Sequence, residues 1–162
     1  MVTQAQETPS PYASEGVKLR SGLQDILRPR LNSCLRLPLY SSRIQAGFPS
    51  PGDDYIEKTL DLNEHLIEHP AATFFVRVSG DSMVGAGIHQ DDILIVDRSL
   101  KAKHNSIVIA VLNGELTVKR LKIQSGRYSL VPENPAYREI GITEEMDFHI
   151  WGVVTSVVHQ LR

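Results

Sequence analysis

A serine on a tight turn is the first residue of this 162-residue chain that is suited to chemistry. Ser82 lies in the stretch SGDSM at positions 79–83, where Gly80 permits a sharp turn and successive N–H groups can point the same way. Such a serine can attack a carbonyl carbon, and the backbone N–H groups of Asp81 and Ser82 can hold the developing oxyanion. Gly-Asp-Ser turns are mostly structural, so the pattern needs a base beside it.

Lys119 is the candidate base. It lies in the apolar stretch 116–123 and shares one face of an extended strand with Thr117 and Leu121. Burial disfavours the ammonium form, and lowering a lysine pKa from ~10.4 to near 7 costs about 4 to 5 kcal/mol. The neutral amine can then act as a general base toward Ser82. Taken alone, a strand lysine next to Arg120 and Lys122 is more often a solvated residue at the edge of a sheet.

The six histidines form no recognisable catalytic or metal-binding pattern. His65 and His69 stand four residues apart, but no third ligand or acidic partner follows at a typical spacing. The other four fall in expected loops or strands without a Ser/His/Asp order: His89, His104, His149 and His159. We therefore expect no metal site and no cofactor.

Composition and charge are those of a soluble globular protein, with 41% hydrophobic residues and a formal net charge of −2. This net charge argues against a protein that binds nucleic acid over its whole surface. Residues 17–43 are basic, however, and could contact DNA or an acidic partner. Apolar runs are far shorter than the ~20 residues of a membrane span, and the polar N-terminus resembles no secretory signal. With Cys34 as the only cysteine, read as a free thiol, we expect a cytoplasmic protein.

The elements that must position Ser82 and Lys119 are mainly strands. β-branched and aromatic residues predict them at 73–78, 93–96, 107–112, 116–123, 128–131 and 148–158. Asn113-Gly114 predicts a type I′ hairpin, and Asp61, Glu64 and the apolar stripe before Pro70 predict a short capped helix. The fold class is therefore mostly β, a compact antiparallel domain with short helices.

The N-terminal part is expected to be a flexible arm. Residues 1–16 are too polar to order, and the apolar spacing of 19–27 predicts a short helix that Pro29 ends. This arm is too short for a helix-turn-helix domain of about 60 residues, so no sequence-specific DNA binding is expected. The prolines and glycines of 47–52 indicate an extended linker.

Four blocks, in order from about Leu37 to Arg162, resemble the UmuD and LexA family of self-cleaving Ser/Lys peptidases. LPLYSSRIQAGFPSPGDDYIEKTLDLNEHLIEHP resembles the cleavage region, and FFVRVSGDSMVGAGIHQDDILIVDRS the serine motif. GELTVKRL resembles the lysine strand, and LVPENPAY the late loop. The chain looks like a MucA-like member with an N-terminal extension, and the resemblance implies a LexA/signal-peptidase-like β fold.

The resemblance implies that Ser82 is the nucleophile, Lys119 the base, and the bond between Ala46 and Gly47 the substrate. Familiar UmuD members have Cys before the glycine, whereas LexA-type proteins have Ala, and Gly47 has no Cβ to block attack. Cleavage would remove an arm of residues 1–46 and leave 47–162 as the β-rich peptidase and dimerisation domain.

The family further implies three partners: a second copy in a homodimer, a RecA filament on single-stranded DNA that stimulates cleavage, and an error-prone UmuC-type Y-family DNA polymerase. The trimmed dimer would serve that polymerase in the SOS response. Alternatives are a LexA-like cleavable repressor, an inert RecA- or polymerase-binding accessory module, and a signal-peptidase-like enzyme acting in trans, which normally needs a membrane anchor.

Overall fold

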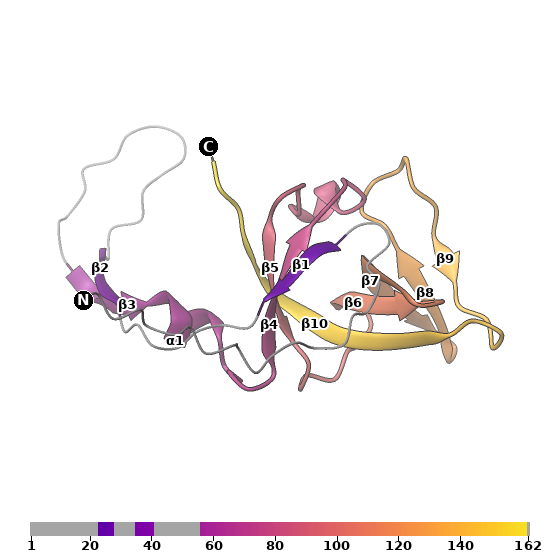
Figure 1. The fold of residues 1–162 in the computed structure, drawn as a ribbon, viewed down its shortest axis with the longest axis horizontal. Helices are drawn as coiled ribbons and strands as arrows, with labels where there is room; N and C mark the ends of the chain where they lie inside the picture. Colours follow the sequence, from indigo (N-terminus) through magenta and orange to yellow (C-terminus); the bar gives the residue numbers. More distant parts are fainter. Residues whose placement is uncertain (1–22, 28–34, 41–55, 162) are drawn as a thin grey trace, which may run out of the picture.

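The computed structural model describes residues 23–27, 35–40 and 56–161, and its main feature is an antiparallel sheet of eight strands. The strand order is β1-β4-β5-β10-β6-β7-β8-β9, as Figure 1 shows. The bounds are β1 Leu23–Leu27, β4 Thr73–Val78, β5 Ile93–Asp97, β6 Ile107–Leu112, β7 Glu115–Gln124, β8 Arg127–Val131, β9 Ile140–Gly141 and β10 Phe148–Val158. The predicted mostly β fold class is confirmed.

Three smaller elements complete the described fold. A two-stranded antiparallel sheet pairs β2 (Arg36–Tyr40) with β3 (Ile56–Asp61) and lies at the left of Figure 1. The helix α1 (Leu62–Leu66) follows directly, and the side chain of Asp61 caps it by accepting from the N–H of Asn63 at 2.8 Å. The predicted capped helix is therefore confirmed. A 3-10 turn, η1 (Val84–Ala86), follows β4.

The six strands predicted from β-branched and aromatic residues are all present. The hairpin between β6 and β7 also has the predicted geometry, since Asn113 and Gly114 have φ values of 51° and 81°. Positive φ at both central residues defines the type I′ turn, whose twist matches that of the flanking strands. This hairpin fixes the register of β7 against β6, pairing Val108 with Lys119.

The expected helix over 19–27 is wrong where the structure describes it. Residues Leu23–Leu27 form β1, which pairs antiparallel with β4 and places Leu23 opposite Val78 and Leu27 opposite Phe75. Apolar positions in so short a run fit both helical and strand spacing, and the free edge of β4 offers hydrogen-bond partners that an isolated helix lacks. Residues 1–16 and the linker at 47–52 lie outside the described residues.

The core has one apolar cluster on each face of the curled sheet. On β6, Ile109 and Val111 belong to the first cluster, whereas Val108 and Ala110 belong to the second. Alternation along a strand sends successive side chains to opposite faces, so both faces of β6 are buried. β10 pairs with β5 on one side and β6 on the other, and irregular register near Gly152 and Thr155 lets it bend between them.

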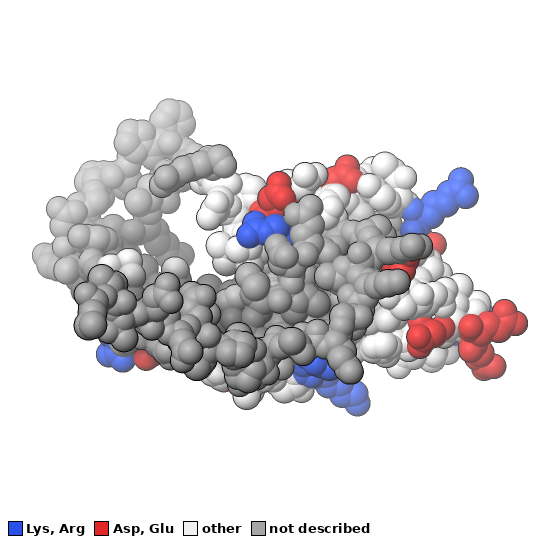
Figure 2. All heavy atoms as spheres, viewed as in Figure 1, with Lys and Arg blue, Asp and Glu red and all other residues white. Residues whose placement is uncertain are grey.

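No described helix is long and apolar enough to cross a membrane. On the face drawn in Figure 2, the visible basic and acidic side chains of the described residues are interspersed, and no continuous basic surface crosses it. This agrees with the net charge of −2.

Candidate active site

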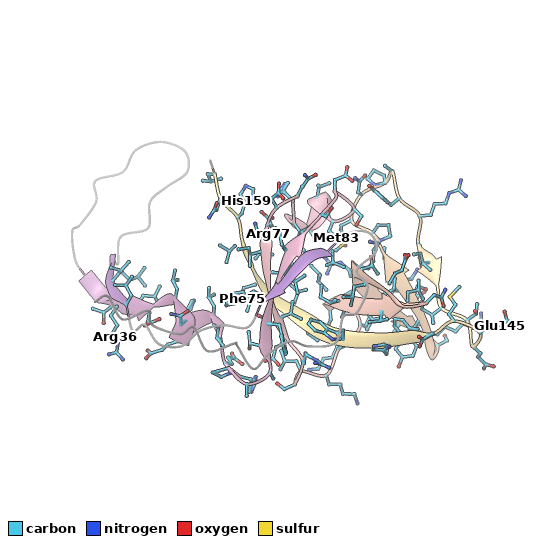
Figure 3. All side chains as sticks on the ribbon, in the orientation of Figure 1. Arg36, Phe75, Arg77, Met83, Glu145 and His159 are labelled. Carbon is cyan, nitrogen blue, oxygen red and sulfur yellow. The ribbon has the colours of Figure 1, made fainter. Side chains whose placement is uncertain are left out.

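Ser82 sits on the turn that carries the chain out of β4. Gly80 has a φ of +93°, a conformation that side-chain-bearing residues rarely adopt, as the sequence predicted. The next residue, Met83, is labelled in Figure 3. It is 1% exposed and packs into the first core cluster, so it fixes the turn to the core. Backbone hydrogen bonds from Ala86 and Ile88 to the carbonyl of Met83 close the turn. Ser82 is therefore held on a rigid base.

The loop after β8 clamps this turn from a second side. The N–H of Glu133 donates to the carbonyl of Ser82 at 2.8 Å, and the N–H of Gly85 donates to the carbonyl of Glu133 at 2.7 Å. A Cβ on Gly85 would lie 2.5 Å from that carbonyl oxygen, so only glycine permits this approach. The late loop, which sequence reasoning gave no role, thus fixes the serine backbone.

Lys119 reaches the serine from β7. Its Nζ lies 2.9 Å from the Oγ of Ser82, 2.9 Å from the Oγ1 of Thr117 and 2.9 Å from the carbonyl oxygen of Val118. The residue is 8% exposed, and its pairing partner Val108 is fully buried. Burial of the amine lowers the pKa of Lys119, because the ammonium form loses its hydration.

A polar network holds the residue before the serine. The hydroxyl of Tyr137 donates to Asp81 Oδ1 at 2.5 Å, and the amide of Asn134 donates to the Asp81 carbonyl at 3.0 Å. The hydrogen bond to the Asp81 carboxylate raises the pKa of Tyr137, since ionising the phenol would break it. Tyr137 and Asn134 belong to the same loop after β8 as Glu133. Three residues of this loop therefore form hydrogen bonds with the turn that carries Ser82.

A cleft of about 260 Å³ opens beside the amine of Lys119. Its walls come from the β6–β7 hairpin and from the loop and strand around β9: Leu112, Glu115, Leu116, Thr117, Lys119, Tyr137, Arg138 and Ile140. The lining contains both apolar and polar side chains, which suits a peptide that needs hydrogen bonds as well as small side-chain pockets.

The histidines do not form a serine-protease triad in the described residues. His69 Nδ1 lies 2.6 Å from Asp97 Oδ2, and the hydroxyl of Ser99 donates to the other oxygen of the same carboxylate at 2.6 Å. The carboxylate therefore stands between histidine and serine, whereas a triad needs the imidazole in the middle to take the serine proton. This group ties the end of α1 to β5 and is structural.

The predicted site residues are thus partly brought together. Ser82 and Lys119 meet, and Asp81 lies beside them, where the oxyanion role of its N–H stays a prediction. Ala46 and Gly47 lie in the connection between β2 and β3, outside the described residues. Sequence reasoning placed Thr117 on the lysine face without a role, and it missed Glu133, Asn134 and Tyr137. The block LVPENPAY was the signal for those three.

Comparison with known proteins places the chain among peptidases. A family model described as peptidase S24-like matches residues 38–155. Protein SamA from Salmonella typhimurium is 50% identical over 77% of this chain and 86% of its own length. Protein MucA from Escherichia coli is 48% identical over 74% of this chain and 82% of its own length. LexA repressor 2 from Pseudomonas putida is 34% identical over 93% of this chain and 71% of its own length.

Proposed function

Because the chain belongs to the peptidase S24-like family, we propose that it is a self-cleaving serine peptidase that cuts between Ala46 and Gly47. Ser82 is the nucleophile in this proposal and Lys119 the base. The observation that carries it is the 2.9 Å contact between the lysine Nζ and the serine Oγ inside a site where burial lowers the lysine pKa. The resemblance to UmuD and LexA-type proteins is confirmed by the relatives named above.

The three neighbours of the lysine amine can all accept from its ammonium form, and they also accommodate the neutral form that a base requires. A neutral amine has two N–H donors and one lone pair. The carbonyl of Val118 can only accept, so it takes one N–H, and Thr117 Oγ1 can take the other. The lone pair then faces the hydroxyl of Ser82 and can receive its proton. Thr117 and Val118 in this way orient the base.

The reaction follows from this arrangement. As Lys119 takes the proton, Ser82 Oγ bonds to the carbonyl carbon of Ala46, and the N–H groups of Asp81 and Ser82 hold the oxyanion. The ammonium then gives its proton to the departing amine of Gly47 as the C–N bond breaks. Water, deprotonated by the same lysine, then attacks the ester, and the lysine gives this proton to Ser82 Oγ as the ester C–O bond breaks and the Ala46 carboxylate is freed. The cleft beside Lys119 accommodates the backbone next to the scissile bond.

The biological role that we propose is in SOS mutagenesis, the role implied by the resemblance to UmuD. Cleavage would be stimulated by a RecA filament on single-stranded DNA, and the trimmed homodimer would join a UmuC-type DNA polymerase. The test is the mass of the chain after incubation with RecA, single-stranded DNA and nucleotide at neutral pH, with each component omitted in turn. The role is supported if a fragment that starts at Gly47 forms only when RecA, single-stranded DNA and nucleotide are all present. It is contradicted if the cleavage rate is the same with and without RecA.

A cleavable repressor is the second candidate, favoured by the similarity to LexA repressor 2 over 93% of this chain. It predicts sequence-specific DNA binding by the intact protein that is lost on cleavage. A gel shift with DNA upstream of damage-inducible genes separates the two, because the SOS mutagenesis role predicts no specific complex. An inert accessory module would show neither binding of this kind nor any processing that Ser82→Ala abolishes.

A further inference from the structure

Two histidines and a buried aspartate converge on one point outside the Ser82–Lys119 site. His159 Nδ1 lies 2.5 Å from Asp92 Oδ1, and His89 Nδ1 lies 3.7 Å from Asp92 Oδ2. The two imidazole rings are 5.1 Å apart between centroids, and one ligand atom from each of the three residues lies within 4.8 Å of the others. The described part of the chain holds one such group of His, Cys, Asp and Glu.

The three residues come from two well-anchored parts of the fold, the turn before β5 and the end of β10. Asp92 precedes β5, and its carbonyl accepts from the N–H of Val78, which fixes it to β4. The N–H of His89 donates to Asp92 Oδ2 at 2.7 Å, so the carboxylate is already oriented within its own turn. His159 directly follows β10, whose last residue, Val158, pairs with Ile93. Figure 3 shows it near the C-terminal end of the chain.

From this geometry we propose that His89, Asp92 and His159 form a binding site for a divalent transition-metal cation of the Zn²⁺ class. Two imidazole nitrogens and one carboxylate oxygen are a recurrent zinc ligand set. Zinc–ligand bonds of about 2.0–2.2 Å place tetrahedral ligand atoms about 3.3 Å from one another. His159 Nδ1 lies 2.5 Å from one carboxylate oxygen and His89 Nδ1 lies 3.7 Å from the other, so rotations of the two exposed rings can bring both nitrogens to this spacing around one oxygen.

The burial of the three side chains suits a metal site with open positions. The carboxylate of Asp92 is 2% exposed, whereas the side chains of His89 and His159 are 50% and 42% exposed. The rings can therefore adjust, the ion can enter from solvent, and water can complete its coordination. The hydrogen bond from the His89 N–H supports the ligating carboxylate from behind, a typical outer-shell arrangement. On binding, the ion takes the place of the hydrogen bond between His159 Nδ1 and Asp92 Oδ1, and the ring then presents the lone pair of Nδ1 to the ion.

A bound ion would join the end of β10 to the turn between β4 and β5. That turn lies at the end of the segment that runs from Ser82 through η1 to β5. The ion would therefore stiffen β4, which precedes the nucleophile, and β5, which follows it. Sequence reasoning expected no metal site, because two of the ligands sit on one turn and the third lies 67 positions beyond Asp92. Only the pairing of β10 with β5 brings them together.

The test is a titration of the full-length protein with Co²⁺, followed by visible absorption, and with Zn²⁺, followed by heat of binding. We expect one ion per chain, at least tenfold weaker binding in His89→Ala and in His159→Ala, and none at the same concentrations in the double variant. His149→Ala is the matched control, since His149 is exposed, lies on β10 and is outside the cluster. It should bind like the wild type.

Thermal unfolding gives a second readout that does not depend on peptidase activity. A saturating excess of Zn²⁺ should raise the Tm of the wild type and of His149→Ala by several degrees, because an ion that binds only the folded state stabilises it. The double variant should show no shift. Absence of binding to the wild type at millimolar Zn²⁺, or equal binding by the double variant, would overturn the proposal.

Discussion

The Nζ of Lys119 and the Oγ of Ser82 lie 2.9 Å apart although 37 positions separate them in the chain. In the described residues no carboxylate forms an ion pair with this lysine, and burial alone accounts for its lowered pKa. The structure therefore places an amine whose pKa burial lowers against a hydroxyl that the turn after β4 presents to it.

Replacing the buried amine should change how stability depends on pH. Lys119 has a pKa of 10.5 when it is solvated, as in the unfolded chain, and a lower pKa in the folded protein. At pH values between these two, the amine is protonated in the unfolded chain and neutral in the folded one, so the unfolded chain binds up to one proton more. Stability of the wild type should therefore rise with pH in that window, by at most about 1.4 kcal/mol per pH unit. Lys119→Met should lose this rise.

The measurement is urea unfolding from neutral to alkaline pH for both proteins. Lys101→Met serves as the control, because Lys101 is exposed. Equal pH dependence in the wild type and Lys119→Met would contradict the view that the folded protein holds the amine neutral.

Thr117→Val should slow self-cleavage without unfolding the protein. The hydroxyl of Thr117 accepts one N–H of the lysine amine, and without it the amine can turn that N–H toward Ser82. We expect a loss of about tenfold in rate, equivalent to about 1.4 kcal/mol, and recovery in Thr117→Ser. Thr155→Val, which removes a hydroxyl bonded to Ile95 on β5, is the matched control. A rate in Thr117→Val equal to that control would exclude the orienting role.

Tyr137→Phe should also slow cleavage, by about tenfold, because it removes a hydrogen bond to a charged group that holds the serine turn. Tyr137 is a positioning residue here, so its loss should lower the rate at every pH and leave the midpoint of the pH–rate profile in place. Tyr128→Phe is the control, since Tyr128 is similarly exposed but lies on β8. A shifted midpoint with an unchanged maximal rate would show that Tyr137 acts on the lysine instead.

Removal of residues 1–46 should open one edge of the main sheet. β1 lies within this segment and pairs with β4, the strand that leads to Ser82. In a chain of residues 47–162, peptides covering β4 should exchange their amide hydrogens faster than in the full chain, while β6 and β7 keep their protection. Hydrogen exchange followed by mass spectrometry measures both. Unchanged exchange at β4 would mean that β1 does not protect that edge in solution.

The strands could be predicted from the sequence where burial on both faces requires a continuous run of apolar residues. Strands such as β5 and β6 are nearly continuous apolar runs with buried centres, and a buried strand of this kind leaves few alternatives. Sequence reasoning failed at β1, whose apolar spacing fits two periods, and it predicted no strand at β2, which contains Pro38. Pro38 is tolerated because a two-stranded sheet leaves one edge of each strand free of hydrogen bonds.

The candidate site divides in the same way. Ser82 and Lys119 were predicted from turn chemistry, strand position and resemblance, but no local signal predicts that Tyr137 meets Asp81 across 56 positions. The same holds for His89 and His159, which only the strand order brings together. Contacts of this kind depend on the folded topology, so they become visible only in the structure.

The most direct test of the central claim is the intact mass of the purified protein after incubation at alkaline pH, where the lysine is neutral without any activator. The wild type should yield a fragment that begins at Gly47 and ends at Arg162, whereas Ser82→Ala and Lys119→Ala should stay whole. If the wild type also stays whole, or if either variant yields the same fragment at the wild-type rate, Ser82 and Lys119 do not cleave this chain.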